Sequence, residues 1–270
     1  MFAILTACFL LAAQSPDETS ADRAWTVLRT GLDSKNADQR AKAAHALGLL
    51  VKNARAQEWA EKALADAHPE VRMEAVSALG QIGAASARPE LRDALNDKDI
   101  KVVVAAANAL YVLKDPAAYD IYYELLTGER KSPGMMQSNL SALKNRREVE
   151  KLVFQTGIGF VPFGGVGYEA WKRVTEDPTT PIRVDAVEKL ESDPDPKSGA
   201  ALQHSCADKK WQIRAASADA IAKRGDPALL SAVTALLLDE NDAVRSEAAA
   251  AVIRLTSQSR TTRPRRTNQK

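Results

Sequence analysis

The sequence predicts an all-α protein, an α-solenoid of about seven antiparallel helix pairs, and three observations lead to this prediction. Hydrophobic residues make up 45% of the chain but aromatic residues only 5%, and alanine, the best helix former, dominates the apolar positions. Runs that alternate apolar and polar residues, which are typical of strands, are nearly absent. A charged motif also recurs with a period of 31 residues, and such periods indicate stacked repeats.

The recurring motif places an acidic residue six positions before an arginine that opens an alanine-rich helix. The arginine position holds Arg40, Arg72, Val103, Arg183, Arg214 and Arg245, with successive spacings of 32, 31, 80, 31 and 31 residues. The acidic position holds Ser34, Asp66, Asp97, Asp177, Asp208 and Asp239. Because these residues recur in phase with the repeat, we interpret them as structural rather than catalytic.

Each repeat reads as two helices separated by a turn. In one of them Val71, Ala75, Ala78, Leu79 and Ile82 follow the spacing of a single helix face. The expected N-caps of these helices are Asn36, Asp99, Thr179 and Asn241. Several of the preceding helices open with Asp-Pro, at Asp115-Pro116, Asp195-Pro196 and Asp226-Pro227, because proline suits the first helical turn. One pair cannot bury its apolar face alone, so the pairs are expected to stack.

The pattern of Asp, five residues and Val/Ile-Arg, followed by an alanine-rich helix ending in Ala-Leu, resembles the HEAT repeat. It is especially similar to the short bacterial type related to phycobilisome-lyase repeats, and the resemblance covers residues 21–257 apart from the middle. In that family the aspartate and arginine pair between adjacent units, so the resemblance implies a ladder along an armadillo-like helical stack. Val103 interrupts this ladder, and so does Met136 in a weak repeat around residues 117–144.

The N-terminus predicts a signal peptide over residues 1–13, because an apolar run too short to span a membrane ends at Gln14. We therefore expect export to the periplasm or beyond. No basic residue precedes the run, so a cytoplasmic protein with an apolar terminus is the alternative, and lipidation at Cys8 is a second one. Removal of the signal would leave Cys206 as the single cysteine, which excludes an intramolecular disulfide.

The spacing of 80 residues leaves room for one weak repeat and an insertion, expected as a Gly- and Phe-rich loop over residues 152–168. The segment Gly157–Tyr168 lacks the lysine of a phosphate-binding loop, and it has too many glycines to span a membrane as a helix. We expect it to pack against its own solenoid, while a membrane-dipping hairpin and a ligand or partner surface stay as alternatives. The candidate partner-binding residues are Phe160, Phe163, Tyr168 and Trp171.

Enzymatic chemistry finds little support in the residues. Deoxyhypusine hydroxylases, which the resemblance brings into consideration, hold iron with His-Glu pairs, but His45, His68 and His204 are not followed by glutamate. His204, Cys206 and Asp208 form one candidate metal cluster, yet Cys206 would point away from the face shared by the other two. We therefore expect no metal, no cofactor and no catalytic residue.

The charge distribution bears on the partner. The net charge is +2, but five of the 37 basic residues lie in Arg260–Lys270, so the rest of the chain is mildly acidic and nucleic-acid binding is not expected. Residues 258–270 are expected to be a disordered basic tail. We expect a monomeric, non-catalytic scaffold that binds another protein in the cell envelope. The alternative is an enzyme similar to a bilin lyase or to deoxyhypusine hydroxylase, and membrane contact by the loop or the tail stays open.

Overall fold

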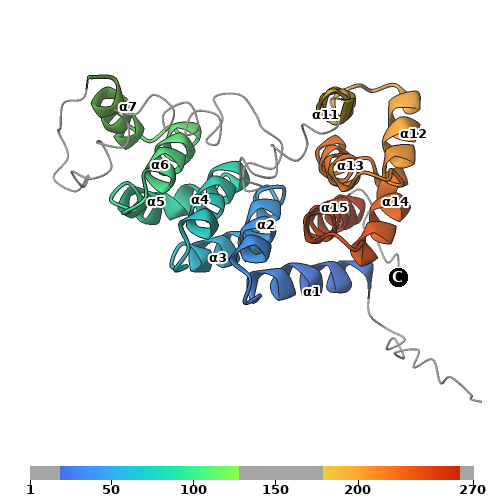
Figure 1. Cartoon of the computed structure of the whole chain (residues 1–270), viewed down its shortest axis with the longest axis horizontal. Helices are drawn as coiled ribbons and strands as arrows, with labels where there is room; N and C mark the ends of the chain where they lie inside the picture. Colours follow the sequence, from blue (N-terminus) through green and yellow to red (C-terminus); the bar gives the residue numbers. More distant parts are fainter. Residues whose placement is uncertain (1–18, 128–178, 262–270) are drawn as a thin grey trace, which may run out of the picture.

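A computed structural model describes residues 19–127 and 179–261 of the chain (Figure 1). Within these ranges the protein consists of twelve α-helices and three short 3-10 helices, and it contains no strand. The prediction of an all-α solenoid is confirmed for this part of the chain. The predicted signal peptide at residues 1–13 and the insertion loop at 152–168 lie outside the described residues.

The first range contains seven α-helices, which are α1 (Ser20–Leu32), α2 (Ala37–Leu47), α3 (Ala54–Ala63), α4 (Pro69–Ile82), α5 (Arg88–Ala94), α6 (Ile100–Val112) and α7 (Ala117–Thr127). The second range contains α11 (Thr179–Leu190), α12 (Pro196–Ser205), α13 (Trp211–Arg224), α14 (Leu230–Ala235) and α15 (Asp242–Thr261). Helix α15 extends to Thr261, past residue 258, where the sequence had predicted the tail to begin. No helix among the described residues is long and apolar enough to cross a membrane.

Side-chain caps start most of these helices as the sequence predicted. Asn36 accepts a hydrogen bond from the backbone of Asp38, and Asp99 accepts one from Lys101, both at 2.8 Å. Asn241 caps α15 in the same way through the backbone of Ala243, at 2.9 Å. These bonds satisfy amide groups that the first turn of a helix leaves without partners. Helix α11 instead begins at Thr179 itself, so the predicted cap lies within the helix.

The second helix of each pair belongs to one continuous row, which runs in the order α11, α13, α15, α2, α4 and α6. We call these the row helices. The helices α3, α5, α12 and α14 lie on the outside of the bend that the row describes (Figure 1). The row does not follow the order of the chain, because α15 at the C-terminal end packs against α2 near the N-terminal end. The last repeat of the chain is therefore stacked on the first.

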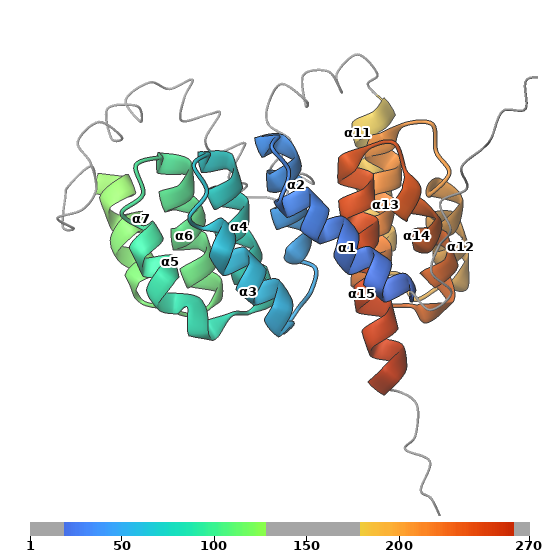
Figure 2. The ribbon, with the colours of Figure 1, turned by 90° about the horizontal axis from the view of Figure 1, so that it is seen from below.

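Helix α1 strengthens this junction because it packs against both α2 and α15 (Figure 2). Leu28 of α1, Leu47 of α2 and Leu255 of α15 are all fully buried in the same hydrophobic cluster. The core around them is built largely from alanine, which lets helices approach closely. Gly80 of α4 shows how close this approach is, since a Cβ atom there would lie 3.0 Å from Ala109 of α6. Small residues thus bring neighbouring row helices into close contact.

Candidate functional site

The repeat arginines connect neighbouring row helices. Arg72 donates hydrogen bonds from Nε and Nη2 to both carboxylate oxygens of Asp97, each at 2.7 Å. Its Nη1 donates to the backbone carbonyl oxygens of Asp66 and Ala67, at 2.9 and 3.2 Å. The guanidinium group thus joins the turn before its own helix to the aspartate of the next repeat. Such a forked pair combines charge with fixed geometry.

The same arrangement recurs at the other end of the row. Arg214 donates to both carboxylate oxygens of Asp239, at 2.6 and 2.8 Å, and to the carbonyl oxygen of Asp208 at 2.8 Å. Arg183 pairs with Asp208. Repetition of one contact set along the stack indicates that these groups hold repeats together, and their hydrogen-bonding capacity is largely used within the fold.

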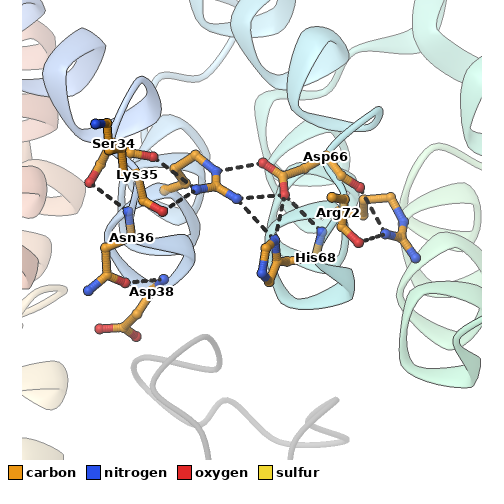
Figure 3. Close-up of polar contacts among 9 residues, drawn as sticks. Ser34, Lys35, Asn36, Asp38, Asp66, His68 and Arg72 are labelled. Carbon is orange, nitrogen blue, oxygen red and sulfur yellow. Dashed lines mark hydrogen bonds and ion pairs between the residues drawn. The ribbon is translucent and has the colours of Figure 1, made fainter.

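The ladder aspartates in the described part of the chain also shape a turn, as the contacts around Asp66 illustrate (Figure 3). Its carboxylate accepts hydrogen bonds from Arg40 at 2.6 and 2.9 Å and from the backbone of His68 at 2.9 Å. The hydrogen bond from Arg40 lowers the pKa of Asp66 to about 2, against the opposing effect of burial. The aspartate is therefore charged at all physiological pH values.

The junction between α15 and α2 departs from the ladder. Ser34 occupies the place of the aspartate there, and it cannot form an ion pair with Arg245. Arg245 pairs instead with Asp242 of its own helix, and Asp242 accepts a hydrogen bond from Gln39 of α2 at 2.7 Å. Gln39 in turn accepts a hydrogen bond from the hydroxyl of Ser34. A chain of four polar side chains thus replaces one ion pair where the two ends of the protein meet.

Several predicted site residues lie outside the described part of the chain. These are the proposed partner-binding residues Phe160, Phe163, Tyr168 and Trp171, and the ladder residue Asp177. Of the candidate metal cluster, Asp208 is paired with Arg183, and Cys206 is a buried free cysteine. Burial raises the pKa of the Cys206 thiol to about 12. Within residues 19–127 and 179–261, no group of three or more His, Cys, Asp or Glu side chains is placed to hold a metal ion.

A second set of charged residues on the row helices was not predicted from the sequence. His45 of α2 lies between two almost fully buried glutamates, with Nδ1 2.7 Å from an oxygen of Glu74 and Nε2 3.8 Å from an oxygen of Glu247. Glu74 belongs to α4 and Glu247 to α15, so this trio bridges three adjacent row helices. Glu74 and Glu247 occupy the same repeat position, two residues after the arginine place, and that recurrence is a signal the sequence contained.

The protonation of this trio reflects burial and charge together. Burial disfavours the charged form of His45, but the charge and hydrogen bond of Glu74, with the charge of Glu247, outweigh it and raise the pKa to about 9. Burial raises the pKa of Glu247 to about 8, although the positive charge of His45 opposes the shift. The two groups are linked: the charges of the two glutamates favour protonated His45, and burial makes Glu247 take up a proton more readily than an ordinary glutamate.

The charged row continues onto α13 and α11. Lys223 of α13 pairs with Asp219 on its own helix at 2.8 Å and with Glu191, at the end of α11, at 3.6 Å. Burial raises the pKa of Glu188 on α11 to about 7. We call the set His45, Glu74, Glu188, Glu191, Asp219, Lys223 and Glu247 the charged stripe. Its carboxylates outnumber its cations, so the stripe suits a positively charged ligand rather than an anion.

One family model matches most of the described repeats. The family model described as HEAT repeats matches residues 25–110, 57–133 and 169–254. No curated protein matches the chain. Among solved structures, human deoxyhypusine hydroxylase in complex with glycerol is 20% identical with a TM-score of 0.34, covering 90% of this chain and 93% of that one.

A second similar structure is the complex of CpcE and CpcF of phycocyanin lyase from Nostoc sp. PCC7120. It is 22% identical with a TM-score of 0.34, covering 90% of this chain and 97% of the other. Likeness at this level carries no inference about activity. The matches to the family model, in contrast, span well over half of the sequence and coincide with the repeated helix pairs and their Asp-Arg contacts. This chain therefore belongs to the family of HEAT-repeat proteins.

Proposed function

We propose that this protein is a non-catalytic scaffold that binds another protein through the row helices, on the inside of the bend. The observation that carries the proposal is the contrast between the two sets of charged residues. The hydrogen-bonding groups of the ladder arginines and aspartates are occupied by contacts between repeats. The charged stripe, by comparison, contains carboxylate oxygens of Glu188, Glu191 and Glu247 that are buried and have no hydrogen-bond partner.

Several features of the fold support a protein ligand. Stacked helix pairs offer an extended surface rather than one enclosed cavity, and such surfaces suit binding to protein segments. The stripe extends over α11, α13, α15, α2 and α4, so a ligand that used all of it would contact five row helices. We also propose that the protein acts in the cell envelope, on the basis of the apolar residues 1–13.

Site-specific photocrosslinking tests this proposal in the native host. A photoreactive amino acid at exposed Gln81, next to the charged stripe on α4, is expected to crosslink one defined protein. The same amino acid at Glu58 on the outer helix α3, where the side chain is 60% exposed, serves as the matched control. Equal crosslinking from both positions, or crosslinking from Glu58 alone, would contradict binding through the row helices.

The enzyme alternative has a separate test. A lyase-like or hydroxylase-like activity would bring a tetrapyrrole or iron into the purified protein. Absorption spectroscopy and elemental analysis of the full chain purified from its host measure both directly. Stoichiometric pigment or iron would favour the enzyme over the scaffold.

A further inference from the structure

We infer that the charged stripe holds a binding site for a lysine or arginine side chain of the partner protein, with Glu247 as its central acceptor. This inference rests on the proposed function, because it names the chemistry by which the scaffold would recognise its partner.

Of the three glutamates in the stripe that have an oxygen without a hydrogen bond, Glu247 is the most buried. The residue is 3% exposed, and its Oε2 atom is buried without a hydrogen-bond partner. Its other oxygen lies 3.8 Å from His45, which is longer than a direct hydrogen bond. Leaving a buried carboxylate oxygen unpaired is costly, and native proteins rarely do so without a reason. A cationic group from outside the chain would satisfy this oxygen.

The helices that pack against α15 surround Glu247 with both signs of charge. His45 approaches from α2, Glu74 from α4, and Asp219 and Lys223 act on it from α13. The two cations already have carboxylate partners of their own, since His45 binds Glu74 and Lys223 binds Asp219. Arg254 lies two helical turns after Glu247 on α15, and it donates a hydrogen bond to the carbonyl oxygen of Leu49. Glu247 therefore shares His45 with Glu74 as its nearest counter-ion, at 3.8 Å, and its Oε2 atom has no hydrogen-bond partner among the described groups.

Two more glutamates, Glu188 and Glu191 at the end of the stripe near α11, also have buried oxygen atoms without hydrogen bonds. Lys223, which pairs with both Glu191 and Asp219, lies between this end of the stripe and Glu247. The oxygens without a hydrogen bond are thus spread over the end of α11 and over α15 instead of converging on one point. This spacing suits two or more basic side chains on one extended segment.

The chemistry of the acceptors favours an organic cation over a metal ion. Metal ligands must converge within a shared coordination sphere, and no such group occurs in the described part of the chain. Lysine and arginine, in contrast, carry their charge on long apolar stems that can lie along a protein surface and place the charged end at depth. An arginine can also engage a carboxylate through two parallel hydrogen bonds. We therefore assign the site to basic side chains of a protein segment.

The test measures binding of a defined basic peptide to the full chain by isothermal titration calorimetry. The probe is the acetylated and amidated peptide Gly-Arg-Gly-Lys-Gly-Arg, and its control replaces arginine with citrulline and lysine with acetyl-lysine. Glu247→Gln keeps the shape of the side chain and is expected to weaken binding on the order of tenfold to a hundredfold. Glu58→Gln on the outer helix α3 removes the same charge and is expected to leave binding unchanged.

A second variant and a second readout keep the result interpretable. Glu188→Gln is expected to weaken binding less than Glu247→Gln, because Glu188 is the less buried of the two. Binding to the wild-type chain is expected to release protons at pH 7, since a cation favours the ionised form of Glu247, and the Glu247→Gln variant should release fewer. Titrations in two buffers of different ionisation enthalpy measure this release.

Several outcomes would overturn the site. These are equal affinity for the charged and the neutral peptide, equal affinity of wild type and Glu247→Gln, or tighter binding of spermidine or calcium ions than of the peptide. The crosslinking experiment separates this inference from the proposed function. If Glu247→Gln still crosslinks its partner from position 81 at wild-type yield, the scaffold stands and the basic-side-chain site is wrong. If no partner crosslinks from the row helices at all, the scaffold itself fails.

Discussion

Arg254, in the last helix of the chain, donates a hydrogen bond from Nη1 to the carbonyl oxygen of Leu49, 2.9 Å away and 205 residues earlier in the sequence. Leu49 lies two residues after the end of α2, so this bond fastens the last repeat to the first. Burial lowers the pKa of Arg254, against the attraction of Asp219, but a guanidinium group stays charged at any physiological pH. The contact therefore persists across the pH range in which the protein would work.

The first prediction concerns this junction. A protease site inserted between residues 140 and 141 should let the chain be cut without separating its two halves. Helices α1 and α2 would still bury their apolar faces against α15, and Gln39 and Arg254 would still bond across the junction. Size-exclusion chromatography of the cut protein should show one species of the intact mass.

The uncut protein and the cut double variant Gln39→Ala/Arg254→Ala serve as controls. We expect the double variant to dissociate at lower denaturant concentration than the cut wild type, because both cross-junction hydrogen bonds are lost. Separation of the wild-type fragments in plain buffer would show that the contact between α15 and α2 does not hold the halves together.

The second prediction concerns the ladder. Asp239→Ala should lower the free energy of unfolding by about 1–3 kcal/mol, because Arg214 would lose both of its carboxylate hydrogen bonds while 11% exposed. Asp185→Ala is the matched control. Its ion pair with Lys189 is exposed on both sides, and such pairs contribute on the order of 0–1 kcal/mol. Urea unfolding followed by circular dichroism measures both. Equal destabilisation by the two substitutions would contradict a structural ladder.

The third prediction concerns pH. The folded-state pKa of His45 is raised to about 9, so the stability it contributes is complete below its ordinary value near 6.5 and is lost as the pH rises toward 9. Glu247 keeps its proton in the folded state up to about pH 8, whereas the unfolded chain loses it near pH 4.5. The folded state thus binds more protons over this range, and stability falls as the pH increases.

Asp66 affects the stability of the protein at acidic pH. Its folded-state pKa near 2 contributes stability above its ordinary value of 3.8, and this stability is lost as the pH falls through 2. Together, the shifted pKa values of His45, Glu247 and Asp66 place the pH of maximum stability below 7. Thermal melting from pH 4 to 9 should show the decline, and Glu247→Gln should flatten it between pH 5 and 8. A maximum above pH 8 would contradict the assignment.

The fourth prediction concerns the Gly- and Phe-rich loop, which lies outside the described residues. If Phe160 and Phe163 pack against the solenoid, alanine at both positions should lower the melting temperature by several degrees, since each buried ring stabilises the fold by about 1.5–3 kcal/mol. Binding to anionic vesicles should be absent in wild type and variant alike. Unchanged melting combined with lost vesicle binding would assign the loop to a membrane instead, and unchanged melting with lost partner crosslinking would assign it to the partner.

Much of the local structure was predictable because it depends on neighbours in the sequence. Asn36 and Asp99 cap their helices through backbone amides two residues away, so a short stretch of sequence contains both partners. The ladder was implied by the family resemblance, and Arg72 indeed reaches Asp97 in the following repeat. The charged stripe was harder to recognise. His45, Glu74 and Glu247 come together only because three row helices become adjacent, although the recurrence of glutamate two residues after the arginine place pointed toward it.

The sequence alone thus determined the helix pairs and their stacking, because periodic apolar faces must be buried against units of the same kind. The family resemblance implied which residues join successive repeats. The order of the stack was decided by the tertiary structure. Repeats at the two ends of the chain each have one face without a sequential neighbour, and α15 covers both α1 and α2. The substitution of Ser34 at the ladder position marks where this junction occurs. The contacts of Ser34 with Gln39, Asp242 and Arg245 form only when the two ends of the chain pack together. The repeat period does not predict this packing, because it does not specify which exposed end faces pair.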